Sequence, residues 1–436
     1  MAIRLLTFCF LDPKNVDGHY EVVGFISQYG RLPHSGELGQ AYHPPLYYLL
    51  AAPIYRWSGS FKVVQVLSLA LSMLTLLVLY DLIYRRNVIT SNSARRYSFL
   101  LACFLPQFVL YGLFVSNDTL TIFLGCCTAW CIAELVRAPD YKHLVALACM
   151  SILGLLTKAT FVAYFPVLCC VVLFVWRKSG RSRGAALGVA TAFLILVAAC
   201  SSYKEIDNYR QYGHAFVSNI DFHPAWATGQ RKTFAGKRSY VDVNFAKLLA
   251  SPSYSPATQS AYPLMLYGTF WYQHVPESNF VGSTHRPFTW MAVGIYLFAL
   301  LPTTAFLGGL FALMKQGPSL ARLRIDDEVQ AGVVTTYATA ALLLANLAIM
   351  LTAVGKYHVW SIMQGRLLFP SCFGMLAVMS VGIERLEHSA RCRRMLNVSI
   401  AALCVLFVMY LLGEMGLQVI LRFLPGVKAY LRTMVR

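Results

Sequence analysis

The chain has 436 residues, of which 57% are hydrophobic and only 13% are charged. A soluble protein would carry about a quarter charged residues. This deficit, together with repeated apolar runs long enough to span a bilayer, predicts an all-α polytopic membrane protein and excludes a string of soluble domains. The net charge of +18 does not indicate a nucleic-acid partner, because the Lys and Arg residues lie in short links between apolar runs, as the positive-inside rule describes.

Two segments precede the first full span. Residues 1–11 are apolar but too short to cross a bilayer, and no small-residue cleavage site follows them. We expect either the end of a truncated first span or a short interfacial segment. Residues 12–60 are polar and form the first outer loop. Within this loop we predict a surface helix that ends at Gly30 and a short helix over 46–57 that begins after two prolines.

The rest of the chain consists mainly of transmembrane helices, in two groups at 61–203 and 288–420. A large aromatic-rich outer loop at 204–287, with short helices, separates the groups, and a basic tail at 421–436 follows them. With the truncated first segment, the pattern predicts a bundle of about 10–11 transmembrane helices. The spans are expected at about 61–84, 97–115, 119–136, 143–157, 160–176, 185–203, 288–314, 331–352, 367–384 and 396–420.

The basic links fall on one side of the predicted bundle, which the positive-inside rule makes cytoplasmic. The polar segments then share the outer face, although the basic tail also falls there, against the rule. These outer segments are 12–60, 116–118, the region of Lys158, 204–287 and 353–366.

The twelve cysteines do not indicate a disulfide framework. Eleven lie in apolar runs, the long polar segments contain none, and no CxxC occurs, so we interpret them as packing residues. The lack of cysteines in the outer segments favours a bacterial inner (plasma) membrane over the endoplasmic reticulum.

Carboxylates stand out at two places on the outer side. The first is Asp17-Gly18-His19 with Glu21, where Asp17 is either the N-cap of the surface helix or a functional acid. The second is Asp118, at the tight turn between two spans. It is either an N-cap or a functional acid, since a charge at the membrane border is a candidate for function.

Cations stand out at two further places on the same side. Lys158 lies between two apolar runs, and Arg366 opens a span in the sequence Gln364-Gly365-Arg366. Each is either a side chain that snorkels to the membrane surface or a ligand for a lipid-linked phosphate. Tyr357 and His358 would add an aromatic, hydrogen-bonding rim beside Arg366.

Taken in order, these segments resemble the GT-C superfamily of integral-membrane glycosyltransferases, which includes the aminoarabinose transferases of lipid A and the protein mannosyltransferases. Each motif is weak alone, but their order and their common face look like the family layout over most of the chain. The resemblance lies in Asp17-Gly18-His19, Gly30-Arg31-Leu32-Pro33, His43-Pro44-Pro45-Leu46-Tyr47-Tyr48, Leu105-Pro106-Gln107, Ser116-Asn117-Asp118, Leu156-Thr157-Lys158 and Gln364-Gly365-Arg366-Leu367-Leu368-Phe369-Pro370.

The resemblance implies a hexosyl- or pentosyltransferase. Its donor would be a polyprenyl- or dolichyl-phosphate sugar, and its acceptor a hydroxyl or amine of a glycan, lipid or protein on the outer or luminal face. Asp17 would be the catalytic base and Asp118 the second acid. The substrate-binding residues would be the phosphate ligands Lys158 and Arg366 together with His19, Glu21, Arg31, His43, Tyr357, His358 and Gln364.

Some members of the superfamily use a divalent metal, so the resemblance also implies Mg or Mn held by Asp17 and Asp118. Gly18 departs from the pattern, because related enzymes often have two adjacent acids there. Glu21, one helical turn later, would be the substitute. Two rival hypotheses stay open at this point: a lipid or solute transporter or flippase, and an inactive member of the same fold. The first is disfavoured because no internal repeat occurs and the charges sit at the border of the spans.

Overall fold

The computed structural model describes residues 1–14, 17–252, 255–272, 286–316 and 328–423. These residues form helices and no strands, which confirms the predicted all-α class. Eight of the helices are long and apolar enough to cross a membrane, so the chain is a multi-pass membrane protein. They are Phe61–Arg85, Asn117–Arg137, Ala159–Lys178, Arg183–Ser201, Trp290–Gln316, Glu328–Tyr357, Gly365–Leu386 and Ala390–Gly413.

Two of the ten expected spans are absent from this set. The run at 97–115 is divided into α5 (Asn92–Phe104) and α6 (Pro106–Tyr111). Proline has no amide proton and disfavours a helical residue before it, and Leu105 accordingly has ψ 115°. The run at 143–157 forms α8 (Tyr141–Leu155), which at 15 residues is short for a bilayer. The expected total of 10–11 is therefore too high for the described part of the chain.

The N-terminal segment and the polar stretch together form three short helices. The N-terminal segment forms α1 (Ala2–Phe10). Both helices expected in the first loop are present, as α2 (His19–Tyr29) and α3 (Leu46–Ser58), and they pack against each other. Gly30 ends α2 with φ 67°, a left-handed conformation that favours glycine.

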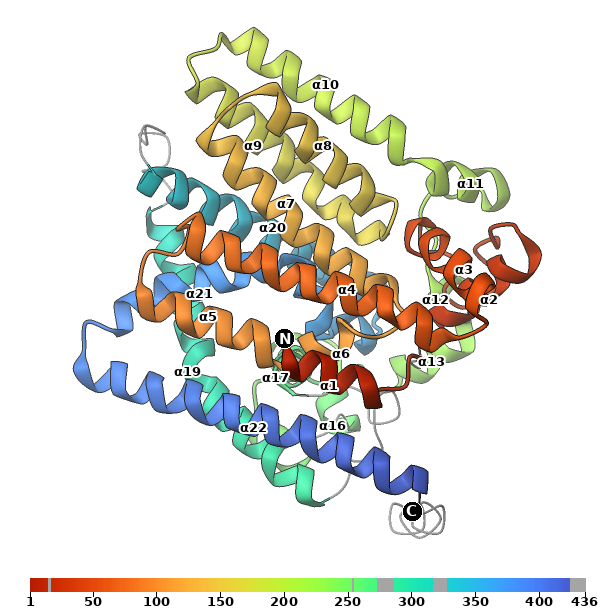
Figure 1. Cartoon of the computed structure of the whole chain (residues 1–436), viewed down its shortest axis with the longest axis vertical. Helices are drawn as coiled ribbons and strands as arrows, with labels where there is room; N and C mark the ends of the chain where they lie inside the picture. Colours follow the sequence, from red (N-terminus) through yellow and green to blue (C-terminus); the bar gives the residue numbers. More distant parts are fainter. Residues whose placement is uncertain (15–16, 253–254, 273–285, 317–327, 424–436) are drawn as a thin grey trace.

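Residues 203–271 form a series of short helices. They are α11 (Tyr203–Tyr212), α12 (Asn219–Phe222), α13 (Pro224–Arg231), α14 (Arg238–Val241), α15 (Phe245–Ala250), α16 (Pro256–Gln259) and α17 (Tyr262–Trp271). Of these, α11, α12 and α13 lie nearest to α2 and α3 in Figure 1. The end of the expected loop, at 273–285, lies outside the described residues. So do positions 317–327, which include Arg322 and Arg324 of one predicted cytoplasmic link, and positions 424–436 of the basic tail.

Helix α7 (Asn117–Arg137) is the centre of the bundle (Figure 1). It contributes to both large apolar cores, and 78% of its most apolar stretch is buried. One core includes α5, α19 (Arg286–Gln316), α21 (Cys372–Leu386) and α22 (Ala390–Phe423). The other includes α8, α9 (Tyr164–Lys178), α10 (Arg183–Ser201) and α20 (Glu328–Tyr357), and α4 (Phe61–Tyr80) reaches both.

Two spans begin at short helices next to the predicted cations, and a third span follows the polar stretch. Helix α4 follows α3, the 3-10 helix η2 (Ala159–Ala163) leads from Lys158 into α9, and η6 (Gly365–Ser371) leads from Arg366 into α21. Their far ends carry basic residues: Arg85 closes the π-helical turn η1 (Asp81–Arg85) after α4, Lys178 ends α9, and Arg385 lies in the last turn of α21. This distribution agrees with the predicted orientation.

The contact between α19 and α21 depends on small residues. A Cβ on Gly382 would lie 1.7 Å from the carbonyl oxygen of Ala305, and one on Gly309 would lie 2.0 Å from that of Val378. The two backbones therefore approach too closely for any larger residue, as is common between membrane helices.

Gly382→Ala is expected to destabilise the protein, because the new methyl group would meet backbone that must move. Overpacking typically costs about 1–3 kcal/mol, so the midpoint of thermal unfolding in detergent should fall by several degrees. Gly308→Ala, on the partner helix α19, meets nothing within 4 Å and serves as the matched control. Equal midpoints for the two variants would contradict the assignment.

Candidate active site

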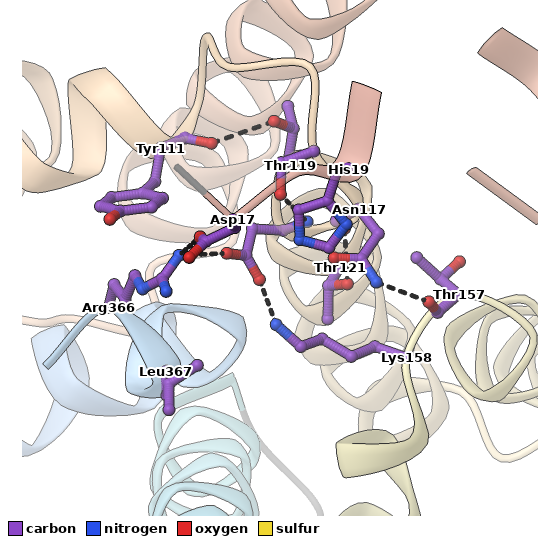
Figure 2. A network of polar contacts seen from close by, with 12 residues as sticks. Asp17, His19, Tyr111, Asn117, Thr119, Thr121, Thr157, Lys158, Arg366 and Leu367 are labelled. Carbon is purple, nitrogen blue, oxygen red and sulfur yellow. Dashed lines mark hydrogen bonds and ion pairs between the residues drawn. The ribbon is translucent and has the colours of Figure 1, made fainter. Parts of the chain in front are cut away.

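Four charged side chains from four distant parts of the chain meet in one cluster (Figure 2). Arg366 Nη1 donates to Asp118 Oδ2 at 3.2 Å and also pairs with Asp17. Lys158 pairs with the other oxygen of Asp118. The side chains of Arg366, Asp118 and Lys158 are each about one-tenth exposed, and that of Asp17 is 20% exposed. Two acids and two cations thus form a balanced, largely buried network that is most open at Asp17.

Asp17 reaches the cluster because of the residue that follows it. The N-cap of α2 is Gly18, in a left-handed conformation with φ 77°, which favours glycine. No side chain caps this helix, so the N-cap interpretation of Asp17 is wrong. Burial would raise the pKa of Asp17, but the Arg366 guanidinium outweighs it and holds that pKa below its usual value.

Asp118 and Lys158 are positioned by the first turn of α7. Ser116 is the N-cap of α7 and accepts a hydrogen bond from the Asp118 amide, so Asp118 is not the cap and its carboxylate is left to meet cations. Asn117 donates to the Thr157 carbonyl at 3.3 Å, which fixes Lys158 opposite Asp118. Lys158 is buried and ion-paired, so its interpretation as a snorkelling side chain is wrong.

Arg366 is held from several directions, and it too does not snorkel. Gln364 Oε1 accepts from its Nε at 2.7 Å, and the guanidinium carbon lies 4.4 Å from the centre of the Tyr111 ring. The Gly365 amide donates to Thr269 Oγ1 of α17 at 2.7 Å. A Cβ on Gly365 would lie 2.5 Å from the Phe270 backbone, so only glycine allows this approach.

A layer of histidine and tyrosine lies next to the cluster. The rings of His19 and His43 stack with their centroids 5.6 Å apart, and Tyr42 packs on His43 at 4.0 Å. His19 Nδ1 makes a 2.7 Å hydrogen bond with the Tyr48 hydroxyl. Burial lowers the pKa of His19 to about 4, and it also lowers that of His43. Both imidazoles are therefore neutral near pH 7, and His43 and Tyr48 line a small hollow that extends to Lys204.

For four of the predicted substrate-binding residues, the described surroundings lie outside the charged cluster. Glu21 is exposed on α2. Arg31 forms a 2.7 Å ion pair with Glu37, which lies only six residues away in sequence. The Tyr357 carbonyl accepts from Arg231 of α13 at 2.9 Å, and His358 stacks on Phe234 at 4.1 Å.

Sequence reasoning missed Tyr111, Tyr48 and Thr269, which support the site directly. The resemblance included Tyr48 in a motif without giving it a role. Nothing in the sequence connects Tyr111 or Thr269 with Arg366, because those contacts depend on how α6 and α17 pack against η6.

The cluster fits a divalent metal poorly as it stands. The carboxylates of Asp17 and Asp118 already face Arg366 and Lys158, and cations next to a metal ion would repel it. Among the described residues, no group of three or more metal-ligating side chains occurs. Metal use through Asp17 and Asp118 stays a prediction.

One family model matches part of the chain. The model described as dolichyl-phosphate-mannose-protein mannosyltransferase matches residues 42–203, a stretch that contains His43, Asp118 and Lys158. The other two members of the cluster, Asp17 and Arg366, lie outside the matched stretch.

Solved structures similar to this chain include two of ArnT from Cupriavidus metallidurans. The one bound to undecaprenyl phosphate is 14% identical, with a TM-score of 0.38, and the match covers 88% of this chain and 77% of that one. The apo form is 12% identical, with a TM-score of 0.36 and coverages of 89% and 78%. No curated protein matches the sequence significantly.

The buried histidines predict that acid destabilises the fold. His19 binds a proton below about pH 6.5 when unfolded but only below about 4 when folded. The unfolded state therefore binds more protons in this window, and stability falls as the pH falls from 6.5 towards 4. The loss for His19 reaches up to about 3 kcal/mol, and His43 adds to it in the same direction.

Thermal unfolding in detergent between pH 7.5 and 4.5 measures this effect. The midpoint of the wild type should fall with pH, and His19→Gln should show a clearly shallower dependence. His214→Gln, at an exposed position, is the control and should follow the wild type. Parallel curves for wild type and His19→Gln would contradict the role of His19.

Proposed function

We propose that this protein is a glycosyltransferase that moves a sugar from a polyprenyl-phosphate or dolichyl-phosphate donor to an acceptor hydroxyl or amine on the outer or luminal face of the membrane. The observation that carries the proposal is the cluster next to the starts of membrane spans, in which Arg366 and Lys158 both pair with Asp118 at the start of α7. Arg366 also pairs with Asp17 of the first loop. The similarity of residues 42–203 to the dolichyl-phosphate-mannose-protein mannosyltransferase family supports the proposal.

The two carboxylates have different surroundings, and this suggests different roles. Asp118 contacts both cations and is only 10% exposed, so it holds Lys158 and Arg366 in position. Asp17 contacts Arg366, is twice as exposed, and lies just before the short helix α2 rather than on a transmembrane helix. Asp17 is therefore the better candidate for the base that meets an acceptor.

The donor phosphate would replace the carboxylates as partner of the guanidinium. Arginine binds phosphate through two parallel donors, while lysine adds a point charge. When Arg366 turns to the phosphate, the Asp17 carboxylate loses the charge that lowers its pKa. Its basicity then rises when the donor is bound, which couples donor binding to activation of the acceptor.

In the transfer step, the acceptor oxygen forms a bond to the anomeric carbon while the bond between that carbon and the phosphate oxygen breaks. The acceptor proton goes to Asp17, and the polyprenyl phosphate leaves with the electron pair. The negative charge on the leaving phosphate is balanced by Arg366 and Lys158, which are already in place before the reaction. His19 and His43, neutral in the adjacent layer, can exchange hydrogen bonds with sugar hydroxyls without adding charge.

Asp17→Asn should reduce transfer by about 10²–10⁴-fold, because the amide cannot accept the acceptor proton. The assay incubates purified protein with radiolabelled undecaprenyl-phosphate sugars and a membrane extract as acceptor source, and it follows the release of undecaprenyl phosphate. Asp12→Asn removes a nearby exposed carboxylate and should leave the rate unchanged. Transfer by Asp17→Asn at the wild-type rate would reject Asp17 as the base. Sugar flux into vesicles without transfer by the wild type would favour a transporter instead.

Arg366→Lys should weaken the binding of undecaprenyl phosphate about tenfold, or by about 1.4 kcal/mol, because lysine keeps the charge but loses the planar fork. The dissociation constant of the purified protein for the lipid, measured in detergent, tests this expectation. Lys356→Arg, at an exposed position at the end of α20, is the reciprocal control and should bind as the wild type does. Unchanged affinity in Arg366→Lys would place the lipid phosphate elsewhere.

A further inference from the structure

A buried arginine outside the active cluster has no described carboxylate partner. Arg4, on α1, is 1% exposed, and the ion pairs of the described residues do not include it. Its guanidinium instead donates to Ser72 Oγ at 2.6 Å, to the Ala102 carbonyl at 2.9 Å and to the Phe108 carbonyl at 3.3 Å. Burial of an arginine is costly, so these three contacts call for an explanation.

The two carbonyls lie on either side of the break between α5 and α6. In a continuous helix, the Ala102 carbonyl would accept from the amide of residue 106. That residue is Pro106, which has no amide proton. Arg4 Nη2 takes the place of the missing donor, while Nη1 reaches the Phe108 carbonyl one turn into α6.

The surroundings of the guanidinium are fitted to it. A Cβ on Gly112, just after α6, would lie 2.5 Å from Ser72 Oγ, 2.9 Å from the Phe108 carbonyl oxygen and 3.1 Å from Arg4 Nη1. The guanidinium also lies 5.3 Å from the centre of the Phe108 ring, within the range of a cation–π contact. Residues of α1, α4 and α6 thus enclose a single hydrogen-bonding unit.

This unit connects to the active cluster through Tyr111, the last residue of α6. The Tyr111 ring supports the Arg366 guanidinium at 4.4 Å. The Tyr111 carbonyl accepts from Thr119 Oγ1 of α7 at 3.0 Å, one residue after Asp118. Helix α6 has only six residues, so it depends on such contacts for its position, with Arg4 on one side and α7 on the other.

We propose that Arg4 is a positioning residue. It substitutes for the missing amide of Pro106 and fixes α6, and in this way it holds the Tyr111 ring against the Arg366 guanidinium. Under the proposed function, its loss weakens donor binding although Arg4 does not touch the donor. The part that concerns donor binding rests on the proposed function, and the part that concerns the helix break does not.

A double-mutant cycle with Arg4→Met and Pro106→Ala tests the proposal in the full-length protein. Alanine restores an amide at 106, so the double variant should recover at least half of the thermal stability that Arg4→Met loses. The second readout is the dissociation constant for undecaprenyl phosphate, which should rise roughly fivefold in Arg4→Met and recover in the double variant. Additive losses of stability, or wild-type affinity in folded Arg4→Met, would overturn the proposal.

Lys62→Met is the matched control. Lys62 also ties α1 to α4, through hydrogen bonds to the carbonyls of Phe8 and Leu11, at the other end of α1 from Arg4. It should lower stability without changing lipid affinity, and a loss of affinity equal to that of Arg4→Met would overturn the proposal by showing that any loosening of α1 has this effect.

Ser72→Ala provides a second test of the proposal if Arg4→Met does not fold. It removes one acceptor but keeps the cation, and it should lower stability and affinity in the same direction by a smaller amount. Unchanged stability in this variant would overturn the proposal. If wild-type protein binds no undecaprenyl phosphate, the proposed function fails, while the stability cycle still decides the role of Arg4.

Discussion

The ion pairing of Arg366 with two carboxylates is the interaction on which the arrangement of the site depends. Its partners come from the first loop and from the central helix, 349 and 248 positions away in sequence. Removing one member of such a buried network leaves an uncompensated charge and typically costs about 3–5 kcal/mol. With Lys158, the cluster therefore fixes four distant segments relative to one another, as well as providing the groups that the proposed chemistry uses.

The class of fold and the members of the cluster could be predicted from the sequence for physical reasons. Hydrocarbon demands long apolar helices, so eight of the ten expected spans appear as spans. Charges are rare in such helices and have functional value there, which singled out Asp118, Lys158 and Arg366. The structure brings them together with Asp17, although their roles in catalysis remain predictions.

What the sequence did not predict depends on contacts between distant segments. Arg31 forms an ion pair with the nearby Glu37, and His358 stacks on the Phe234 ring. Neither contact can be inferred from the sequence pattern alone. The sequence pattern predicts a single span across 97–115, whereas the structure breaks it before Pro106. The donor that replaces the lost amide comes from Arg4, about a hundred residues earlier. Tyr111 joins the site only through that broken helix.

The equal numbers of acids and cations in the cluster have a consequence for turnover. Under the proposed function, the leaving lipid phosphate competes with anions that belong to the protein itself. Asp17 and Asp118 can reclaim the guanidinium as soon as the phosphate moves away, and their return offsets the cost of breaking its ion pair. A product that carries a long hydrocarbon chain and a charged head can therefore diffuse back into the bilayer without leaving an unpaired cation behind.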